Sequence, residues 1–175
     1  MKDDIRRREL EHLMQAPAPY KRINIVKMEM VKEGMSLYGM GQFRNPKVAA
    51  ETVYPLVERA DREMVLVMSL DIQMMPVALE VVSVGNVDCC ILDMKNIFKH
   101  AILCNASHLI CFHNHPSGNA QPSAEDRRVT ERIKKCGELL GIQLADHIIL
   151  GWEGTYYSFH AEEGWNDSEK GERAA

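Results

Sequence analysis

The stretch 108–140 constrains the fold more than any other part of the chain. The apolar run His108–His113 has the composition of a buried strand, and Pro116-Ser117-Gly118 then permits a tight turn. Ser123 suits the N-cap of a helix whose first turn carries two acids and whose apolar positions continue to Leu140. The sequence therefore predicts a strand, a turn, and a helix that returns beside the strand.

Three side chains in this stretch, His113, His115 and Asp126, form a candidate metal site. Side chains alternate along a strand with period two, so the two imidazoles should leave the same face as the strand ends. Asp126, in the first turn of the helix, can swing back to meet them. Two histidines and one carboxylate make a three-ligand zinc set that leaves the fourth tetrahedral position for water. This pattern predicts one zinc ion and hydrolysis by an activated water.

The rest of the chain predicts an α/β domain in which strands and helices mix without a strict βαβ rhythm. We expect a mixed central β-sheet flanked by helices. Apolar spacing and the positions of Pro and Gly predict helices from Asn45-Pro46 to near Ala60, over Lys95–Asn105 and from Ser123 to Gly141, and strands over Met64–Leu70, Pro76–Gly85, His108–His113, Leu144–Leu150 and Tyr156–Phe159.

Outside that domain the sequence is less regular. We expect residues 1–45 to form an N-terminal extension, residues 46–164 to form the domain, and the polar residues 165–175 to be a disordered tail.

Composition excludes several classes of function. The formal net charge of −4 provides no global basic field, so any contact with DNA would need a local patch. No apolar run approaches the ~20 residues that cross a bilayer, so no membrane partner is expected. The charged N-terminus lacks an apolar signal region, and the five cysteines have no paired spacing. We therefore expect a cytoplasmic protein with reduced thiols.

The His-x-His, Ser and Asp pattern resembles the JAMM signature of the JAB/MPN metalloprotease-like superfamily, and further residues are similar to its RadC-like branch. They are Asn105-Ala106, the block His113-Asn114-His115-Pro116-Ser117-Gly118, Pro122-Ser123 with Asp126, Asp146-His147-Ile148-Ile149, and Tyr157-Ser158-Phe159 with Gly164. This resemblance implies a cytidine-deaminase-like MPN fold. It also implies a zinc metallopeptidase that cleaves a peptide or isopeptide bond in a peptide or protein substrate.

The resemblance also implies a catalytic base and an oxyanion donor. The base is a Glu immediately before a buried strand, and Glu63 occupies that place before Met64–Leu70. Glu80, inside the next strand among apolar residues, is a rival for this role. Ser123 can cap its helix, and by resemblance it can also donate a hydrogen bond to an oxyanion. His147, at the head of a strand, is interpreted as a structural hydrogen-bonding residue.

Two other functions are compatible with the same sequence. A RadC-like protein could act in DNA repair or with mobile elements as a DNA- or protein-binding module. A nuclease is the third hypothesis, but phosphoryl chemistry favours two metals, and the motif supplies ligands for only one.

Overall fold

The computed structural model describes Glu11 and residues 42–43, 45–85 and 93–165. The described domain belongs to one compact unit, Ser36–Ala175. The predictions for the extension 1–45 and for the tail 165–175 fall almost entirely outside the described residues. Among the helices that the structure does describe, none combines the length and apolar character that a membrane span requires.

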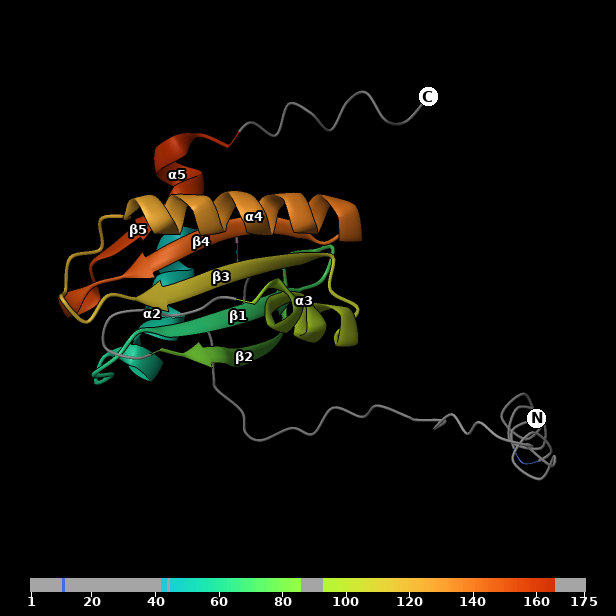
Figure 1. The fold of residues 1–175 in the computed structure, drawn as a ribbon, viewed down its shortest axis with the longest axis horizontal. Coiled ribbons are helices and arrows are strands. Elements are labelled where there is room, and N and C mark those ends of the chain that lie inside the picture. The colour runs from blue at the N-terminus through green and yellow to red at the C-terminus, as the bar shows by residue number, and fades with distance from the viewer. Residues whose placement is uncertain (1–10, 12–41, 44, 86–92, 166–175) are drawn as a thin grey trace, which may run out of the picture. The chain divides into compact units, whose positions relative to one another are not determined.

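A five-stranded mixed sheet forms the centre of the described domain (Figure 1). The strand order is β2-β1-β3-β4-β5, in which β3 and β4 are parallel and the other neighbouring pairs are antiparallel. A parallel pair needs a crossover connection, and here the crossover carries a long helix. The strands are β1 (Met64–Leu70), β2 (Pro76–Val84), β3 (His108–Asn114), β4 (Gln143–Leu150) and β5 (Tyr156–Ser158).

Helices cover both faces of the sheet, so the predicted mixed sheet flanked by helices is confirmed (Figure 1). One face packs against α2, and the other packs against α3 and α4. The helices are α2 (Pro46–Val57), α3 (Met94–Leu103), α4 (Ala124–Leu140) and α5 (Phe159–Glu163), with a short 3-10 turn, η1 (Trp152–Gly154), between β4 and β5.

Alternation along β3 decides which face receives the first histidine. Ile110 and Phe112 lie in the core beneath α2, whereas Leu109 and Cys111 lie in the core beneath α3 and α4. His113 continues the second series, so it projects from the α4 face at the end of its strand. The period-two pattern therefore aims His113 toward the beginning of α4.

The beginning of α4 is fixed by a reciprocal capping box. Ser123 Oγ accepts a hydrogen bond from Asp126 N (3.1 Å), and Asp126 Oδ2 accepts one from Ser123 N (2.7 Å). Gly141 ends the helix in the left-handed conformation with φ 70°, as the sequence predicts. The N-cap therefore holds the Asp126 carboxylate as well as the helix terminus.

The structure differs from the sequence prediction at the last strand. The strand predicted over Tyr156–Phe159 ends at Ser158, because Ser158 caps a helix that the sequence analysis missed: its Oγ accepts a hydrogen bond from Ala161 N (3.0 Å). Ser158 Oγ also donates to the buried carboxylate of Asp146 (2.6 Å). Phe159 therefore begins α5 and is fully buried.

Candidate metal centre

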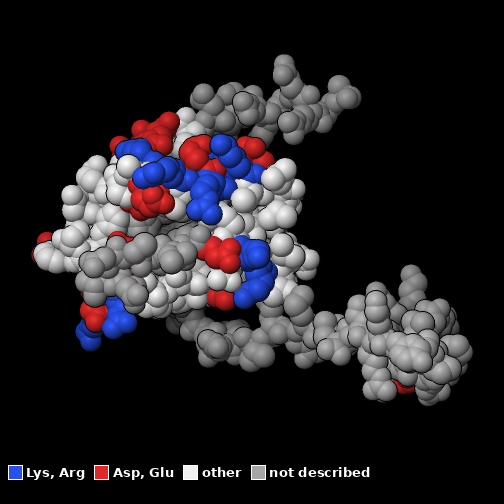
Figure 2. All heavy atoms as spheres, in the orientation of Figure 1, with Lys and Arg blue, Asp and Glu red and all other residues white. Residues whose placement is uncertain are grey.

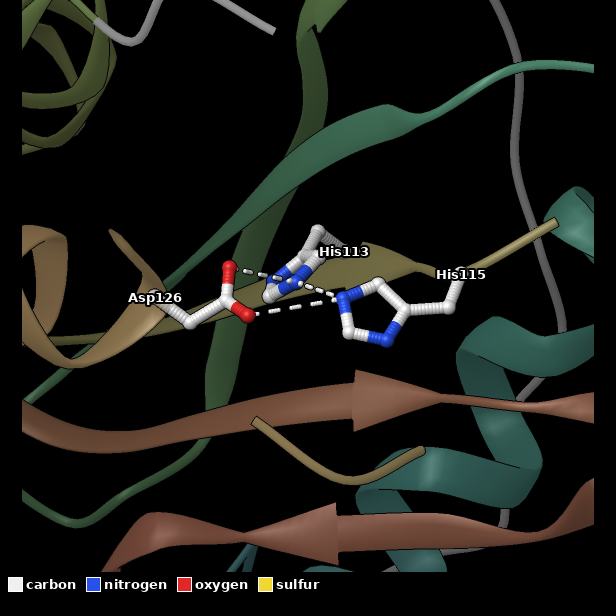
Figure 3. Close-up of side chains that lie close together, drawn as sticks. All are labelled: His113, His115 and Asp126. Carbon is white, nitrogen blue, oxygen red and sulfur yellow. Dashed lines mark hydrogen bonds and ion pairs between the residues drawn. The ribbon is translucent and has the colours of Figure 1, made fainter. Parts of the chain in front are cut away.

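His113, His115 and Asp126 point toward one another from β3, the turn after it and α4 (Figure 3). His113 Nε2 lies 2.9 Å from His115 Nε2 and 3.1 Å from Asp126 Oδ1, and His115 Nε2 lies 3.5 Å from Asp126 Oδ2. These side chains form the one group of three or more possible ligands found among the described residues. The three-ligand set expected from the sequence thus converges on one point.

The separations fit a shared divalent cation. Ligands 2.0–2.2 Å from a tetrahedral centre lie about 3.3–3.6 Å apart. The distance of 3.5 Å between His115 and Asp126 lies within that range, and the other two, 2.9 and 3.1 Å, are a few tenths of an ångström shorter. The two Nε2 atoms cannot both carry a proton at 2.9 Å, and two bare nitrogens repel unless a positive charge lies between them. The site therefore suits a metal that accepts both lone pairs and balances the carboxylate.

The electrostatics of Asp126 match this interpretation. Burial acts to raise the pKa of Asp126, but the interactions with the imidazoles of His113 and His115 prevail and hold that pKa well below its ordinary value. Ser123 Oγ adds a further hydrogen bond to Asp126 Oδ2 at 2.6 Å. The carboxylate therefore stays charged, as a metal ligand must.

His115 is oriented by its own turn. Its Nδ1 donates a hydrogen bond to the carbonyl oxygen of Asn119 (2.7 Å), which directs Nε2 toward Asp126. Burial acts to lower the pKa of His115, but the hydrogen bond to Asp126, the Asn119 carbonyl and the charges of Asp126 and Glu63 together raise it. The negative groups around His115 thus favour a positive charge at this point of the site.

Trp152 braces the same turn from outside. Its Nε1 donates to the carbonyl oxygen of Pro116 (3.1 Å), and its backbone N donates to that of Gly118 (3.1 Å). Gly118 has φ 83°, and a Cβ atom there would overlap the indole ring. The turn therefore requires glycine for two reasons, its left-handed backbone and the closeness of Trp152.

Asn114, between the two histidines, faces away from the metal site and holds the segment that carries Glu63. Its Oδ1 accepts a hydrogen bond from Met64 N (2.8 Å), and its Nδ2 donates to the carbonyl oxygen of Arg62 (3.1 Å). The two bonds flank Glu63, whose own carbonyl accepts one from Gly85 N (2.7 Å). The backbone on both sides of Glu63 is thereby tied to β3.

The structure separates the two candidate bases. The charge of Glu63 contributes to the raised pKa of His115, so Glu63 lies within electrostatic reach of the site. The charge of Glu80 acts instead on the pKa values of His100, in α3, and of Cys104, at the C-cap of that helix.

His113 has a second partner, which the sequence analysis assigned only a structural role. Its Nδ1 lies 2.9 Å from Nε2 of His147 in β4, and Nδ1 of His147 lies 2.7 Å from Thr130 Oγ1 in α4. Thr130 carries no sequence signal for a site, because a threonine in a helix resembles any other core position. Only the parallel pairing of β3 with β4 brings these residues together.

Comparison with known proteins gives consistent results. A family model described as the RadC-like JAB domain matches residues 43–165. A Thermotoga maritima protein described as "UPF0758 protein" is 41% identical over 116 residues, which cover 66% of this chain and 50% of that protein. A protein of Histophilus somni (strain 2336) with the same description is 40% identical over 124 residues, which cover 71% of this chain and 55% of that protein. The chain thus spans about half the length of these relatives, and their description names no reaction.

Proposed function

This chain belongs to the family of RadC-like JAB domains, and on that premise we propose that it is a zinc-dependent hydrolase that cleaves a peptide or isopeptide bond. The observation that carries the proposal is the convergence of His113, His115 and Asp126 on one point, with both Nε2 atoms directed there. Three protein ligands leave one tetrahedral position for solvent, as hydrolytic zinc sites require.

Each residue has a defined part in the proposed reaction. A zinc ion in this site would supply a water with its pKa lowered toward ~7 and would polarise the substrate carbonyl. The Glu63 carboxylate would accept a proton from the attacking water and pass it to the leaving nitrogen. Ser123, whose proton is donated to Asp126 Oδ2 in this structure, turns that proton to the developing oxyanion.

The number of ligand groups favours acyl transfer over phosphoryl transfer. Two-metal sites clamp both the attacking and the leaving oxygen of a phosphodiester. Within the described part of the chain, the side chains of one group alone could hold a metal, and that group suits a single ion. This supports peptide or isopeptide hydrolysis rather than the nuclease hypothesis.

The surface charge gives little support to a DNA-binding module. On the face drawn in Figure 2, basic and acidic side chains are intermingled over α4 rather than gathered into one basic area. Three basic residues of this helix are paired with acids: Arg127 with Glu163, Arg128 with Glu125, and Lys134 with Glu131. A duplex would have to displace these acids to reach the cations.

The proposal is tested by metal analysis and cleavage assays on the same preparations. Elemental analysis of the purified chain should find one equivalent of zinc. The loaded protein is then incubated with a mixture of unmodified peptides and with a lysine-linked isopeptide conjugate, and new amino groups are identified by mass spectrometry. Glu63→Gln should keep the zinc and lose cleavage, because it removes a proton acceptor without touching a ligand.

Glu80→Gln is the matched control, since it makes the same change at the rival position. It should retain both zinc and cleavage. Stoichiometric zinc with no cleavage of either probe would contradict the hydrolase. Cleavage that survives Glu63→Gln but is lost in Glu80→Gln would reverse the assignment of the base.

A further inference from the structure

A closed ring of contacts joins the two ends of the metal site through the interior of the protein. Thr130 Oγ1 donates a hydrogen bond to the backbone carbonyl of Asp126 (2.7 Å) and lies 2.7 Å from His147 Nδ1. His147 Nε2 lies 2.9 Å from His113 Nδ1, and His113 Nε2 lies 3.1 Å from the Asp126 carboxylate. The ring begins and ends at Asp126, and His147 and Thr130 are both buried.

The direction of each hydrogen bond in this ring follows from counting protons. Thr130 has one hydroxyl proton, and that proton is donated to the Asp126 carbonyl, which can only accept. Thr130 Oγ1 must therefore accept from His147, so the proton of His147 lies on Nδ1. His147 is buried, and its ring contacts Thr130, His113 and Phe159, none of which is an anion that could balance a charge. The imidazole is therefore neutral, and with its single proton on Nδ1 its Nε2 is bare.

The count continues to the metal ligand. The bare Nε2 of His147 accepts a hydrogen bond from its partner, His113 Nδ1, at 2.9 Å. The proton of His113 therefore lies on Nδ1. A neutral imidazole has a single N–H, so His113 Nε2 then carries a lone pair directed at His115 and Asp126. The alternative tautomer would place a proton at the point where the metal must bind.

We propose that His147 and Thr130 are positioning residues that hold His113 in the tautomer whose Nε2 is free to bind a metal. Neither belongs to the group of three candidate ligands. They act through His113, and Thr130 also fixes the backbone of the other ligand, Asp126. This inference deepens the proposed function, because it concerns the same metal site. It assigns His147 more than a structural hydrogen bond.

Phe159 fixes the plane of the His147 imidazole. Its ring stacks on His147 with the centroids 5.0 Å apart and the planes 8° from parallel, and it is fully buried. A parallel stack prevents the imidazole from turning about its long axis, so the two nitrogens keep their partners. The helix that begins at Phe159 therefore has a part in the site, although it supplies no ligand.

The test removes the hydroxyl of Thr130, which accepts the hydrogen bond from His147. Thr130→Val keeps the shape of the side chain and removes the oxygen that accepts from His147 Nδ1. Without that acceptor the proton of His147 can move to Nε2 and donate to His113, which forces the proton of His113 onto its own Nε2. Zinc affinity, measured by competition with a chelator, should fall by about 10–100-fold, as for other partners that orient metal ligands. Thr130→Ser restores the hydroxyl and should restore the affinity.

A second readout needs no metal. Long-range proton–nitrogen NMR spectra of the metal-free protein distinguish a protonated ring nitrogen from a bare one. In the wild type, His113 and His147 should both be protonated at Nδ1. In Thr130→Val, the proton of each should shift toward Nε2, a change that a merely structural role would not produce.

Ser69→Ala is the matched control. Ser69 Oγ lies 3.0 Å from His100 Nδ1, so it is another buried hydroxyl paired with a buried imidazole. It pairs across the sheet with Leu109, four residues or ~13 Å along β3 from His113. Its loss should leave both the zinc affinity and the His113 tautomer unchanged, whatever it does to folding.

The outcomes separate this inference from the proposed function. If the wild type binds no zinc, the proposed function fails, while the NMR spectra of the metal-free protein still decide the tautomer. A proton on Nε2 of His113 in the wild type overturns the inference that His147 and Thr130 set its tautomer. A folded Thr130→Val with unchanged affinity and an unchanged tautomer also overturns it.

Discussion

The two histidines of one motif are held by two different regions of the molecule. His113 is oriented from the interior, by His147 in β4 and Thr130 in α4, both buried. His115 is oriented from the surface, by the carbonyl of Asn119 in a turn that Trp152 braces with 63% of its own surface exposed. The same residue type, two positions apart, thus depends on core packing in one case and on a surface turn in the other.

This difference indicates which property each region controls. The interior offers no water to replace a lost partner, so it can decide where a proton lies on His113. The turn lies in contact with solvent, so water can replace its hydrogen bonds, and its contribution is chiefly the position of His115. We therefore expect the two supports to fail in different ways.

Removal of the ligands themselves should have the largest effect and should show the asymmetry at once. His113→Ala and His115→Ala should each abolish stoichiometric zinc binding, because two ligands do not make the set. His113→Ala should also lower the free energy of unfolding of the metal-free protein by about 1–3 kcal/mol, since it leaves the buried Nε2 of His147 without a partner. His115→Ala frees the carbonyl of Asn119, which is exposed, and removes one contact from Asp126, whose carboxylate keeps its hydrogen bond from Ser123. It should therefore cost less stability. Elemental analysis and urea denaturation check both, and equal destabilisation would contradict the asymmetry.

A strained turn should break the surface support. Gly118→Ala places a Cβ atom against the Trp152 ring at a φ of 83°, which we expect to cost about 1–3 kcal/mol and to weaken zinc binding by displacing His115. Gly154→Ala is the control: its φ of 75° brings similar backbone strain, but no atom lies within 4 Å of the added Cβ. It should lose stability and keep its zinc affinity. Equal zinc affinity in the two variants would show that the brace does not position His115.

The pH dependence of stability should also distinguish the two regions, because folding lowers the pKa of His147 and raises that of His115. Burial lowers the pKa of His147, so below its ordinary value of 6.5 the unfolded chain binds a proton that the folded chain excludes. As the pH is lowered below 6.5, the free energy of unfolding of the metal-free protein should therefore decrease. This residue contributes up to about 1.4 kcal/mol per pH unit to that decrease. His147→Gln should flatten that acid limb, as measured by chemical denaturation at a series of pH values.

His115 has the opposite sign. Its pKa is raised in the folded chain, so its contribution is fully present below 6.5 and is lost as the pH rises through the folded value. The two histidines thus act in separate windows, one below and one above 6.5. An acid limb of His147→Gln as steep as that of the wild type would contradict the assignment of His147 as a neutral buried imidazole.

The smallest effect should come from a single bond in the brace. Trp152→Phe keeps an aromatic ring over Gly118 and removes the donor to the Pro116 carbonyl, so we expect a loss of about 1 kcal/mol and little change in zinc affinity. Thermal unfolding with and without zinc measures both. A loss of zinc comparable to that of Gly118→Ala would place the control of His115 in the indole hydrogen bond rather than in the packing of the turn.

The fold class and the grouping of His113, His115 and Asp126 could be predicted from sequence, because both depend on short-range patterns. The run before His113 has the composition of a strand, Ser123 has the chemistry of an N-cap, and Gly141 ends the helix that the pattern begins. The helix α5 escaped prediction, because Ser158 continues an apparent strand until its hydroxyl caps the next residues. Ser158 can continue a strand or cap a helix, and the sequence does not distinguish the two.

The grouping of His113, His115 and Asp126 follows from local sequence, since a strand, a turn and a capped helix leave these side chains little other arrangement. The residues that contact this group from the interior depend on long-range packing. His147 and Thr130 reach His113 only because β3 and β4 pair in parallel register beneath α4. Asn114 reaches the backbone beside Glu63 only because β1 pairs with β3. Ligands follow from spacing along the chain, whereas their partners follow from contacts between strands and helices distant in sequence, which no local pattern encodes.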